Sequence, residues 1–295
     1  MSPSHPRLAR ILQPLPVLVL MLWLLAGVSV AQPPKPGPYV PSPDSVVAAM
    51  LRMAQVGPAD RVIDLGSGDG RIVLTAAQLY GASGFGVEIR DELVALSNQT
   101  ARQAGLEERV RFIKQDMFTT DISNATVVTM YLLPDLVNRL SDKLQQELRP
   151  GTRVLSHDYP IAGWLPDARE TFEEPEKEKA TGIPRATIYL YRIPAPVAGR
   201  WSLQVPAAVS QQPIALALDQ QWQKVGGIAQ IGGREMPFHD IQLSGEALTF
   251  DLRLDRARIA RFSGHVDGDA IRGEVRVGDS VERWSARRTA SGGSR

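Results

Sequence analysis

The chain has 295 residues, of which 43% are hydrophobic and 22% charged, and a formal net charge of +1. This length allows two domains, and the near-neutral charge argues against a protein whose main role is coating nucleic acid. The absence of cysteine excludes disulfides, thiolate metal sites and cysteine nucleophiles, and the four scattered histidines form no metal-ligand pattern.

The N-terminal segment has the pattern of a targeting sequence. Arg7 and Arg10 precede an apolar stretch from Ile11 to Val30, which closes in Ser29-Val30-Ala31. A basic start, an apolar run and a small-x-small site are typical of a secretory signal peptide, here residues 1–31. A run of about twenty residues can also span a bilayer, so an uncleaved anchor is the alternative. The sequence predicts an exported (periplasmic) protein or one anchored in the inner membrane.

A proline-rich linker follows at residues 32–43, where six residues are proline. Ser42 is a candidate helix N-cap with Pro43 at the first helical position, and apolar residues recur at helical spacing from Val46 to Met53. Tyr39 and Ser42 have two interpretations: a packing aromatic with a cap, or part of a lid over a cofactor.

A glycine-rich turn lies between a short apolar strand at residues 62–65 and a helix from Ile72 to Leu79. A dinucleotide fingerprint needs a third glycine three residues after the second, but Arg71 holds that position. Two acids in the turn, Asp64 and Asp69, would repel a pyrophosphate and suit an ammonium group. The sequence therefore allows two interpretations of this turn. It is either a plain strand-turn-helix connection or a cofactor-binding loop formed by Asp64, Gly66, Ser67 and Gly68.

Two further acids follow the next predicted strands. The strand at residues 84–87 ends on Glu88, about twenty residues beyond the loop, where a carboxylate can accept hydrogen bonds from two ribose hydroxyls. The strand from Val110 to Lys114 is followed by Asp116, which can reach an adenine amino group, with Met117 or Phe118 against the ring. Each acid alone suits a solvated surface, but three at successive strand ends fit one ligand.

The remaining elements complete an open sheet. Strands are expected at 125–131 and 152–156, with a helix from Asp135 to Leu148 between them. A last strand at 186–193 is expected to pair antiparallel with part of 168–174, while the charge-rich residues 169–180 indicate a solvated turn. Because open parallel sheets bind ligands at the carboxyl ends of their strands, Tyr131, His157 and Asp158 are candidate catalytic residues around the acceptor.

Several of these strings are similar to one known family. The loop resembles that of class I, seven-strand S-adenosylmethionine-dependent methyltransferases. Residues 38–166 resemble the mitochondrial protein-lysine methyltransferases of the adenine nucleotide translocase and the ATP synthase c-subunit, and their bacterial relatives. The strings are Pro-Tyr-Val-Pro-Ser-Pro, Asp-Leu-Gly-Ser-Gly-Asp-Gly-Arg, Leu-Leu-Pro-Asp-Leu and Leu-x-Pro-Gly-x-Arg-Val-Leu-Ser. One departure is Arg90-Asp91, where the family tends to have Asn-Pro.

The resemblance implies S-adenosyl-L-methionine as cofactor and a membrane-proximal protein lysine as methyl acceptor. It implies that Asp64, Gly66 and Gly68 line the methionine part of the cofactor, with Glu88 at the ribose and Asp116 at the adenine. The expected domain at 44–194 is an α/β, Rossmann-like methyltransferase sheet of seven strands with helices on both faces. Neither nucleic acid nor metal is expected as a partner.

The C-terminal third is expected to form a separate domain. From residue 195 to 286, short alternating runs punctuated by glycines predict a small antiparallel, all-β domain, and the tail at 287–295 is expected to be disordered. The predicted function is transfer of a methyl group to a nucleophilic nitrogen. The alternatives are a small-molecule O- or N-methyltransferase and an exported binding protein that keeps the fold without turnover.

Overall fold

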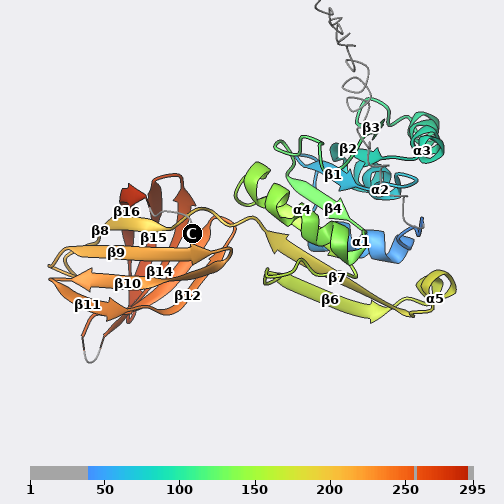
Figure 1. Ribbon diagram of the computed structural model, residues 1–295. Helices are drawn as coiled ribbons and strands as arrows, with labels where there is room; N and C mark the ends of the chain where they lie inside the picture. Colours follow the sequence, from blue (N-terminus) through green and yellow to red (C-terminus); the bar gives the residue numbers. More distant parts are fainter. Residues whose placement is uncertain (1–38, 256–257, 292–295) are drawn as a thin grey trace, which may run out of the picture. The chain divides into compact units, whose positions relative to one another are not determined.

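The computed structural model describes residues 39–255 and 258–291 (Figure 1). The predicted signal peptide or anchor at 1–31 and most of the linker lie outside these residues. Within the described part of the chain, none of the helices combines the length and apolar character needed to cross a membrane.

The first half of the described chain forms a seven-stranded sheet, sheet A, in the order β3-β2-β1-β4-β5-β7-β6. Its strands are β1 (Arg61–Leu65), β2 (Ser83–Glu88), β3 (Val110–Lys114), β4 (Val127–Met130), β5 (Arg153–His157), β6 (Ala168–Glu173) and β7 (Arg185–Arg192). The first five run parallel, and β7 pairs antiparallel with both β5 and β6. The chain order reverses direction between β1 and β4, which is where open α/β sheets bind ligands.

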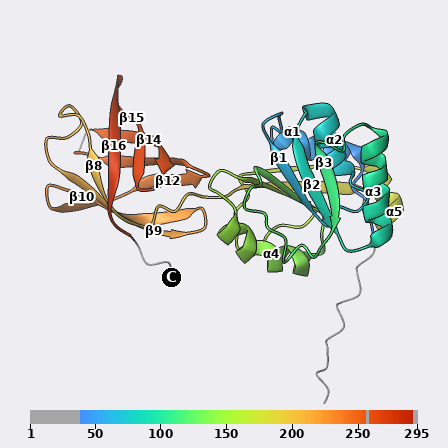
Figure 2. The ribbon, with the colours of Figure 1, turned by 90° about the horizontal axis from the view of Figure 1, so that it is seen from above.

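Helices cover both faces of sheet A (Figure 2). They are α1 (Asp44–Met53), α2 (Arg71–Tyr80), α3 (Asp91–Gln103), α4 (Pro134–Glu147) and α5 (Pro175–Thr181). Buried residues of α1, α2 and α3 share one core with Val62, whereas those of α4 share a second core with Ile63 and Leu65. Successive strand residues point to opposite faces, so a strand covered on both sides has apolar residues at consecutive positions, as Val62 and Ile63 show. The predicted methyltransferase-type sheet is confirmed.

The charge-rich stretch at 169–180 differs from its prediction. The expected antiparallel pairing is confirmed, because β6 pairs with β7 from Ala168 to Glu173. The solvated turn is wrong, because α5 follows and buries the side chains of Glu174 and Lys177. Both charges have partners in the folded chain, which is the condition for burying a charge.

The second half forms a nine-stranded antiparallel sheet, sheet B, in the order β11-β10-β9-β8-β16-β15-β14-β13-β12. Its strands are β8 (Gly199–Gln204), β9 (Ile214–Gln221), β10 (Lys224–Ile231), β11 (Arg234–Pro237), β12 (His239–Ser244), β13 (Ala247–Arg253), β14 (Ile259–Asp267), β15 (Ala270–Val277) and β16 (Ser280–Ser291). Alternate residues such as Leu248, Phe250 and Leu252 are buried in one core with Trp201 and Trp284. The predicted antiparallel β structure is confirmed.

The predicted disordered tail is wrong for residues 287–291, which belong to β16. This part of β16 pairs with β8, from Arg287 opposite Ser202 to Ser291 opposite Gly199. The guanidinium of Arg288 also lies 4.2 Å from the ring centroid of Trp201. Backbone pairing with a strand 85 to 92 positions earlier is a long-range contact, so the polar composition of the tail did not reveal it.

Candidate active site

The glycine-rich turn between β1 and α2 has the backbone that the sequence predicts. Gly66, Gly68 and Gly70 have φ angles of +83°, +54° and +82°, a region that side chains with a Cβ rarely adopt. A Cβ added to Gly66 would lie 2.8 Å from Cδ2 of Leu132, and one added to Gly68 would lie 2.6 Å from Cε2 of Tyr39. The turn therefore needs glycine both for its conformation and for the close approach of neighbouring side chains.

Asp64 is the buried carboxylate of the site. It lies near the end of β1 and accepts a hydrogen bond of 2.7 Å from the hydroxyl of Thr129 on β4. Burial, and then the negative charges of Asp69 and Glu88, raise the pKa of Asp64 to about 7. A cation placed beside Asp64 would relieve this penalty, so the position favours a ligand with an ammonium group.

Glu88 and Asp116 follow Asp64 along the same edge of sheet A. Glu88 accepts hydrogen bonds from the backbone N–H of Gly68 (3.1 Å) and from the backbone N–H of Ile89 (2.9 Å). The exposed Asp116 follows β3, which pairs with β2, and its carboxylate accepts from the backbone N–H of Phe118 at 2.8 Å. The carboxyl ends of β1, β2 and β3 are neighbours, so the three acids lie in the order expected for one extended ligand.

Ser67 and Met117 are also predicted to contact the cofactor, but their side chains are wholly or partly buried in the protein. The Ser67 side chain is buried next to Gly86, and its hydroxyl has no hydrogen-bond partner among the residues that the structure describes. Met117 is half-buried and packs against the core that contains α4. Ser67 can therefore offer a ligand its backbone, while Met117 can offer the exposed part of its side chain.

The segment before α1 lies against the glycine-rich turn and reaches the other half of the site. The Tyr39 ring contacts Gly68, and burial followed by the Asp69 charge raises its pKa. Ser42 is not the helix cap that the sequence predicts: α1 begins at Asp44 with Pro43 as its N-cap. The buried Ser42 hydroxyl instead lies 2.9 Å from Nδ1 of His157.

Arg71, at the start of α2, fastens this segment to the turn. Its guanidinium donates three hydrogen bonds of 2.7–3.1 Å to the carboxylate of Asp69 and one of 2.9 Å to the backbone carbonyl of Ser42. From the sequence, Arg71 breaks a dinucleotide fingerprint and closes the glycine-rich string, but its pairing with Asp69 was not predicted. Its position directly after an acidic turn was the available signal for an Arg–carboxylate pair.

The predicted catalytic residues come together at the carboxyl ends of β4 and β5. The rings of Tyr131 and His157 have centroids 3.9 Å apart. Burial lowers the pKa of His157 to about 4, so its imidazole is neutral at pH 7. Burial, and then the Asp158 carboxylate, raise the pKa of Tyr131, which stays protonated. Nε2 of His157 has no hydrogen-bond partner in the described part of the chain and lies 3.6 Å from Oδ1 of Asp158.

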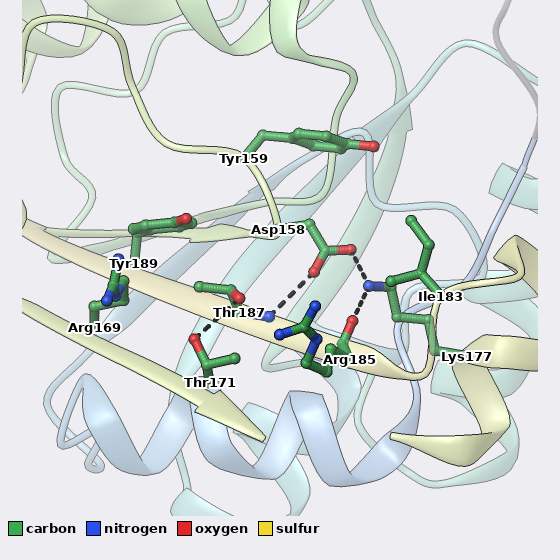
Figure 3. A pocket seen from close by; sticks show the side chains of 9 residues that line it. All are labelled: Asp158, Tyr159, Arg169, Thr171, Lys177, Ile183, Arg185, Thr187 and Tyr189. Atoms are coloured by element: carbon green, nitrogen blue, oxygen red, sulfur yellow. Dashed lines mark hydrogen bonds and ion pairs between the residues drawn. The ribbon is translucent and has the colours of Figure 1, made fainter. Parts of the chain in front are cut away.

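Asp158 is held in place by β7 and α5 (Figure 3). It has a positive φ of 65°, its backbone N–H donates to the carbonyl of Thr187 at 2.6 Å, and its Oδ1 accepts from the Thr187 N–H at 3.1 Å. Its Oδ2 lies 2.7 Å from Nζ of the buried Lys177. Sequence reasoning missed Lys177, because a single buried lysine in a run of charged residues has no pattern of its own.

The residues at the end of β1, β2 and β3 fit an S-adenosylmethionine-type ligand. Such a ligand carries an ammonium group, a ribose diol and an adenine amino group, all of which donate hydrogen bonds. The chain provides a carboxylate acceptor for each in Asp64, Glu88 and Asp116. It also provides the glycine cradle, which added Cβ atoms would fill.

Comparison with known proteins finds its matches in the part of the chain that contains this site. Residues 64–168 match the family model of the ANTKMT methyltransferase domain. The chain is 43% identical over 157 residues to a protein-lysine N-methyltransferase of Saccharolobus islandicus, which covers 53% of this chain and 93% of that protein. It is 36% identical over 131 residues to the adenine nucleotide translocase lysine N-methyltransferase of Mus musculus, covering 44% of this chain and 57% of the mouse protein.

Among solved structures, the chain resembles an RNA methyltransferase from Salinibacter ruber in complex with S-adenosyl-L-homocysteine. The sequence identity is 41% and the TM-score 0.48, over 57% of this chain and 97% of that one. The family match includes every predicted site residue from Asp64 to Asp158. It leaves out Tyr39 and Ser42, which the fold brings to the same edge of sheet A.

Proposed function

We propose that this chain, which belongs to the family of protein-lysine N-methyltransferases, transfers a methyl group from S-adenosylmethionine to the ε-amino group of a lysine in an acceptor protein. The observation that carries the proposal is the division of one sheet edge into two halves. The donor half consists of the glycine-rich turn with Asp64, Glu88 and Asp116, and the acceptor half of Tyr131, His157 and Asp158.

The acceptor half supplies what a lysine needs before it can react. S-adenosylmethionine, when bound, supplies a methyl group that its sulfonium makes electrophilic. The acceptor nitrogen must lose a proton and be aligned with that methyl group. The Asp158 carboxylate can accept hydrogen bonds from an incoming ammonium and take its proton, and burial against Tyr131 and His157 favours the neutral amine.

His157 has an orienting role in this proposal. With a pKa near 4 it is a weak base and carries no charge at pH 7. Its contacts with the Ser42 hydroxyl and the Tyr131 ring fix the imidazole, so that Nε2 faces the Asp158 side of the site. We therefore propose that Asp158 accepts the proton of the lysine ammonium, and that His157 and Tyr131 align the neutral amine with the methyl group.

Cofactor binding is tested by isothermal titration calorimetry with S-adenosylmethionine. Gly66→Arg places a side chain where even a Cβ meets Leu132, so binding should be lost. Gly105→Arg is the matched control: Gly105 also has a positive φ, of +66°, but a Cβ there meets no atom of the described chain within 4 Å. Failure of the wild type to bind, or equal binding by wild type and Gly66→Arg, would contradict the proposal.

The acceptor class is tested with radiolabelled cofactor. Labelled methyl groups should enter the protein fraction of a membrane extract, and acetylation of that extract's lysines beforehand, which converts each amine into a non-nucleophilic amide, should abolish the labelling. A metabolite extract serves as the competing acceptor. Label in small molecules alone would identify a small-molecule methyltransferase instead.

We further propose that the chain is exported, or anchored in the inner membrane through its N-terminal apolar segment, and that its acceptor lies at or near a membrane. The support is the basic, apolar and small-x-small pattern of residues 1–31. N-terminal sequencing of the mature protein, with a topology reporter fused after Arg295, tests this. A cytoplasmic reporter and an intact, unanchored N-terminus would contradict it.

A further inference from the structure

A pocket of about 540 Å³ lies beside the acceptor half of the site (Figure 3). The β6–β7 hairpin, α5 and the residues after β5 form its walls. Arg169 is paired with Tyr189 and Thr171 with Thr187 in the β6–β7 register, so these four side chains lie on one face of the hairpin. The lining residues are Asp158, Tyr159, Arg169, Thr171, Lys177, Ile183, Arg185, Thr187 and Tyr189.

The lining has an excess of positive charge. It contains three cationic side chains and one carboxylate, which gives a formal charge of +2. Lys177 is already paired with Asp158, at 2.7 Å. Arg169 and Arg185 are exposed and, within the described residues, have no carboxylate oxygen within 4.0 Å. The excess charge is therefore carried by these two arginines.

Neighbouring acids do not neutralise the two arginines. Glu173 is paired with Arg185 in the register, but it is exposed and forms no ion pair with it in the described chain. Glu170 belongs to the alternate face of β6 and pairs with Arg52 of α1 at 3.5 Å. The pocket face therefore has two guanidinium groups with ten N–H donors between them, and neither group forms an ion pair within the described residues.

The pocket is continuous with the place where the acceptor lysine must arrive. Asp158 belongs to both, since it lines the pocket and influences Tyr131 through its charge. A lysine side chain that reaches Asp158 brings the residues next to it over the β6–β7 face. The neighbouring residues of the acceptor thus meet Arg169 and Arg185.

We propose that this pocket is a subsite for an acidic side chain of the acceptor polypeptide, within a few residues of the methylated lysine. The inference rests on the proposed lysine methylation and adds to it a substrate class, a lysine flanked by Asp or Glu. The Thr171 and Thr187 hydroxyls are hydrogen-bonded to each other at 3.1 Å, so one of them keeps a free O–H. The two arginines and this hydroxyl offer donors to a carboxylate, while Asp158 in the lining repels a larger polyanion. A peptide segment with a lysine and a nearby glutamate matches both parts of this surface: the lysine meets Asp158, and the glutamate meets the two arginines.

The test uses fluorescence anisotropy of labelled peptides with the full-length chain and saturating S-adenosylhomocysteine. The probes are Gly-Glu-Gly-Lys-Gly-Glu-Gly and the same peptide with both Glu replaced by Gln. Because an exposed charge pair is a modest interaction, we expect the Glu peptide to bind about fivefold more tightly at low salt. Arg169→Gln combined with Arg185→Gln should reduce this ratio to about one by the same reasoning.

Arg102→Gln with Arg111→Gln is the matched control, because it removes two exposed arginines at the β3 side of the sheet and should keep the ratio. Affinity for S-adenosylhomocysteine, measured by calorimetry on every variant, reports both folding and the proposed function. If the wild type does not bind S-adenosylhomocysteine, the proposed methyltransferase function is contradicted. Intact cofactor binding with equal or absent binding of the two peptides would overturn only the subsite.

A competing occupant is an anionic membrane surface. Co-sedimentation with phosphatidylglycerol vesicles distinguishes the two. Vesicle binding that is lost in the Arg169/Arg185 variant, together with equal binding of the two peptides by the wild type, would assign the arginines to lipid and overturn the peptide subsite.

Discussion

The donor half of the sheet A edge contains a motif of consecutive residues, the glycine-rich turn, whereas the acceptor half is assembled from separate segments of the chain. In the donor half, the backbone N–H of Gly68 donates to Glu88, which is 20 positions away. In the acceptor half, the Ser42 hydroxyl contacts His157 across 115 positions. Short-range geometry leaves a motif in the sequence, and long-range geometry does not. The acceptor half is accordingly where single substitutions should reveal the most.

The largest expected effect concerns the buried ion pair of the acceptor half. Lys177→Met leaves the Asp158 carboxylate without its cation, and removing one member of a buried pair costs about 3–5 kcal/mol. Urea unfolding should show this loss. Lys179→Met, at an exposed position of the same helix, is the control and should change stability by less than about 0.5 kcal/mol. Equal stability of the two variants would show that α5 is not coupled to the site.

The second effect separates alignment from cofactor binding. His157→Gln removes the ring that packs against Tyr131, and misplacement of the acceptor should slow methyl transfer by about 100-fold. The affinity for S-adenosylhomocysteine should stay unchanged, since the donor half is intact. His265→Gln, at an exposed site on sheet B, should alter neither quantity. A parallel loss of cofactor affinity would mean that the two halves are not separable.

The third effect tests the donor half through pH. With a pKa of about 7, Asp64 is mostly protonated at pH 6, and only its ionised form attracts an ammonium group. Affinity for S-adenosylhomocysteine should therefore rise with pH through 7 and be about tenfold weaker at pH 6 than above pH 8. Calorimetry at both pH values checks this, and Asp64→Asn should remove the dependence. In the free protein the raised pKa has the opposite sign: the free energy of unfolding falls as pH rises from 3.8 to 7.

The smallest effect concerns the link between the halves. Ser42→Ala removes the hydrogen bond to Nδ1 of His157 and should cost about 1 kcal/mol of stability. Transfer should slow several-fold while cofactor affinity changes little. Ser45→Ala, at the next serine along the chain and within α1, is the comparison, because the Ser45 hydroxyl donates its hydrogen bond to Glu174. Identical kinetics for Ser42→Ala and the wild type would show that His157 is fixed by Tyr131 alone.

Within the described residues, the sequence by itself determined the seven-strand sheet, the glycine-rich turn and the order of Asp64, Glu88 and Asp116. Each of these depends on local rules: apolar runs, glycine at positive φ, and acids just past strand ends. Parallel pairing then places those strand ends side by side. Local patterns in the sequence were therefore enough to predict that the three acids share one edge of the sheet.

Only the tertiary structure decided three contacts. Ser42 contacts His157 instead of capping α1. Lys177 of α5 is buried and pairs with Asp158, and residues 287–291 pair with β8. In each case the partner lies in a different element, and the local composition favoured another state: a cap, a solvated turn or a free tail. A buried charge or a paired tail is stabilised by what it meets in the folded chain. That partner is absent from any short window of the sequence, which is why folding alone revealed it.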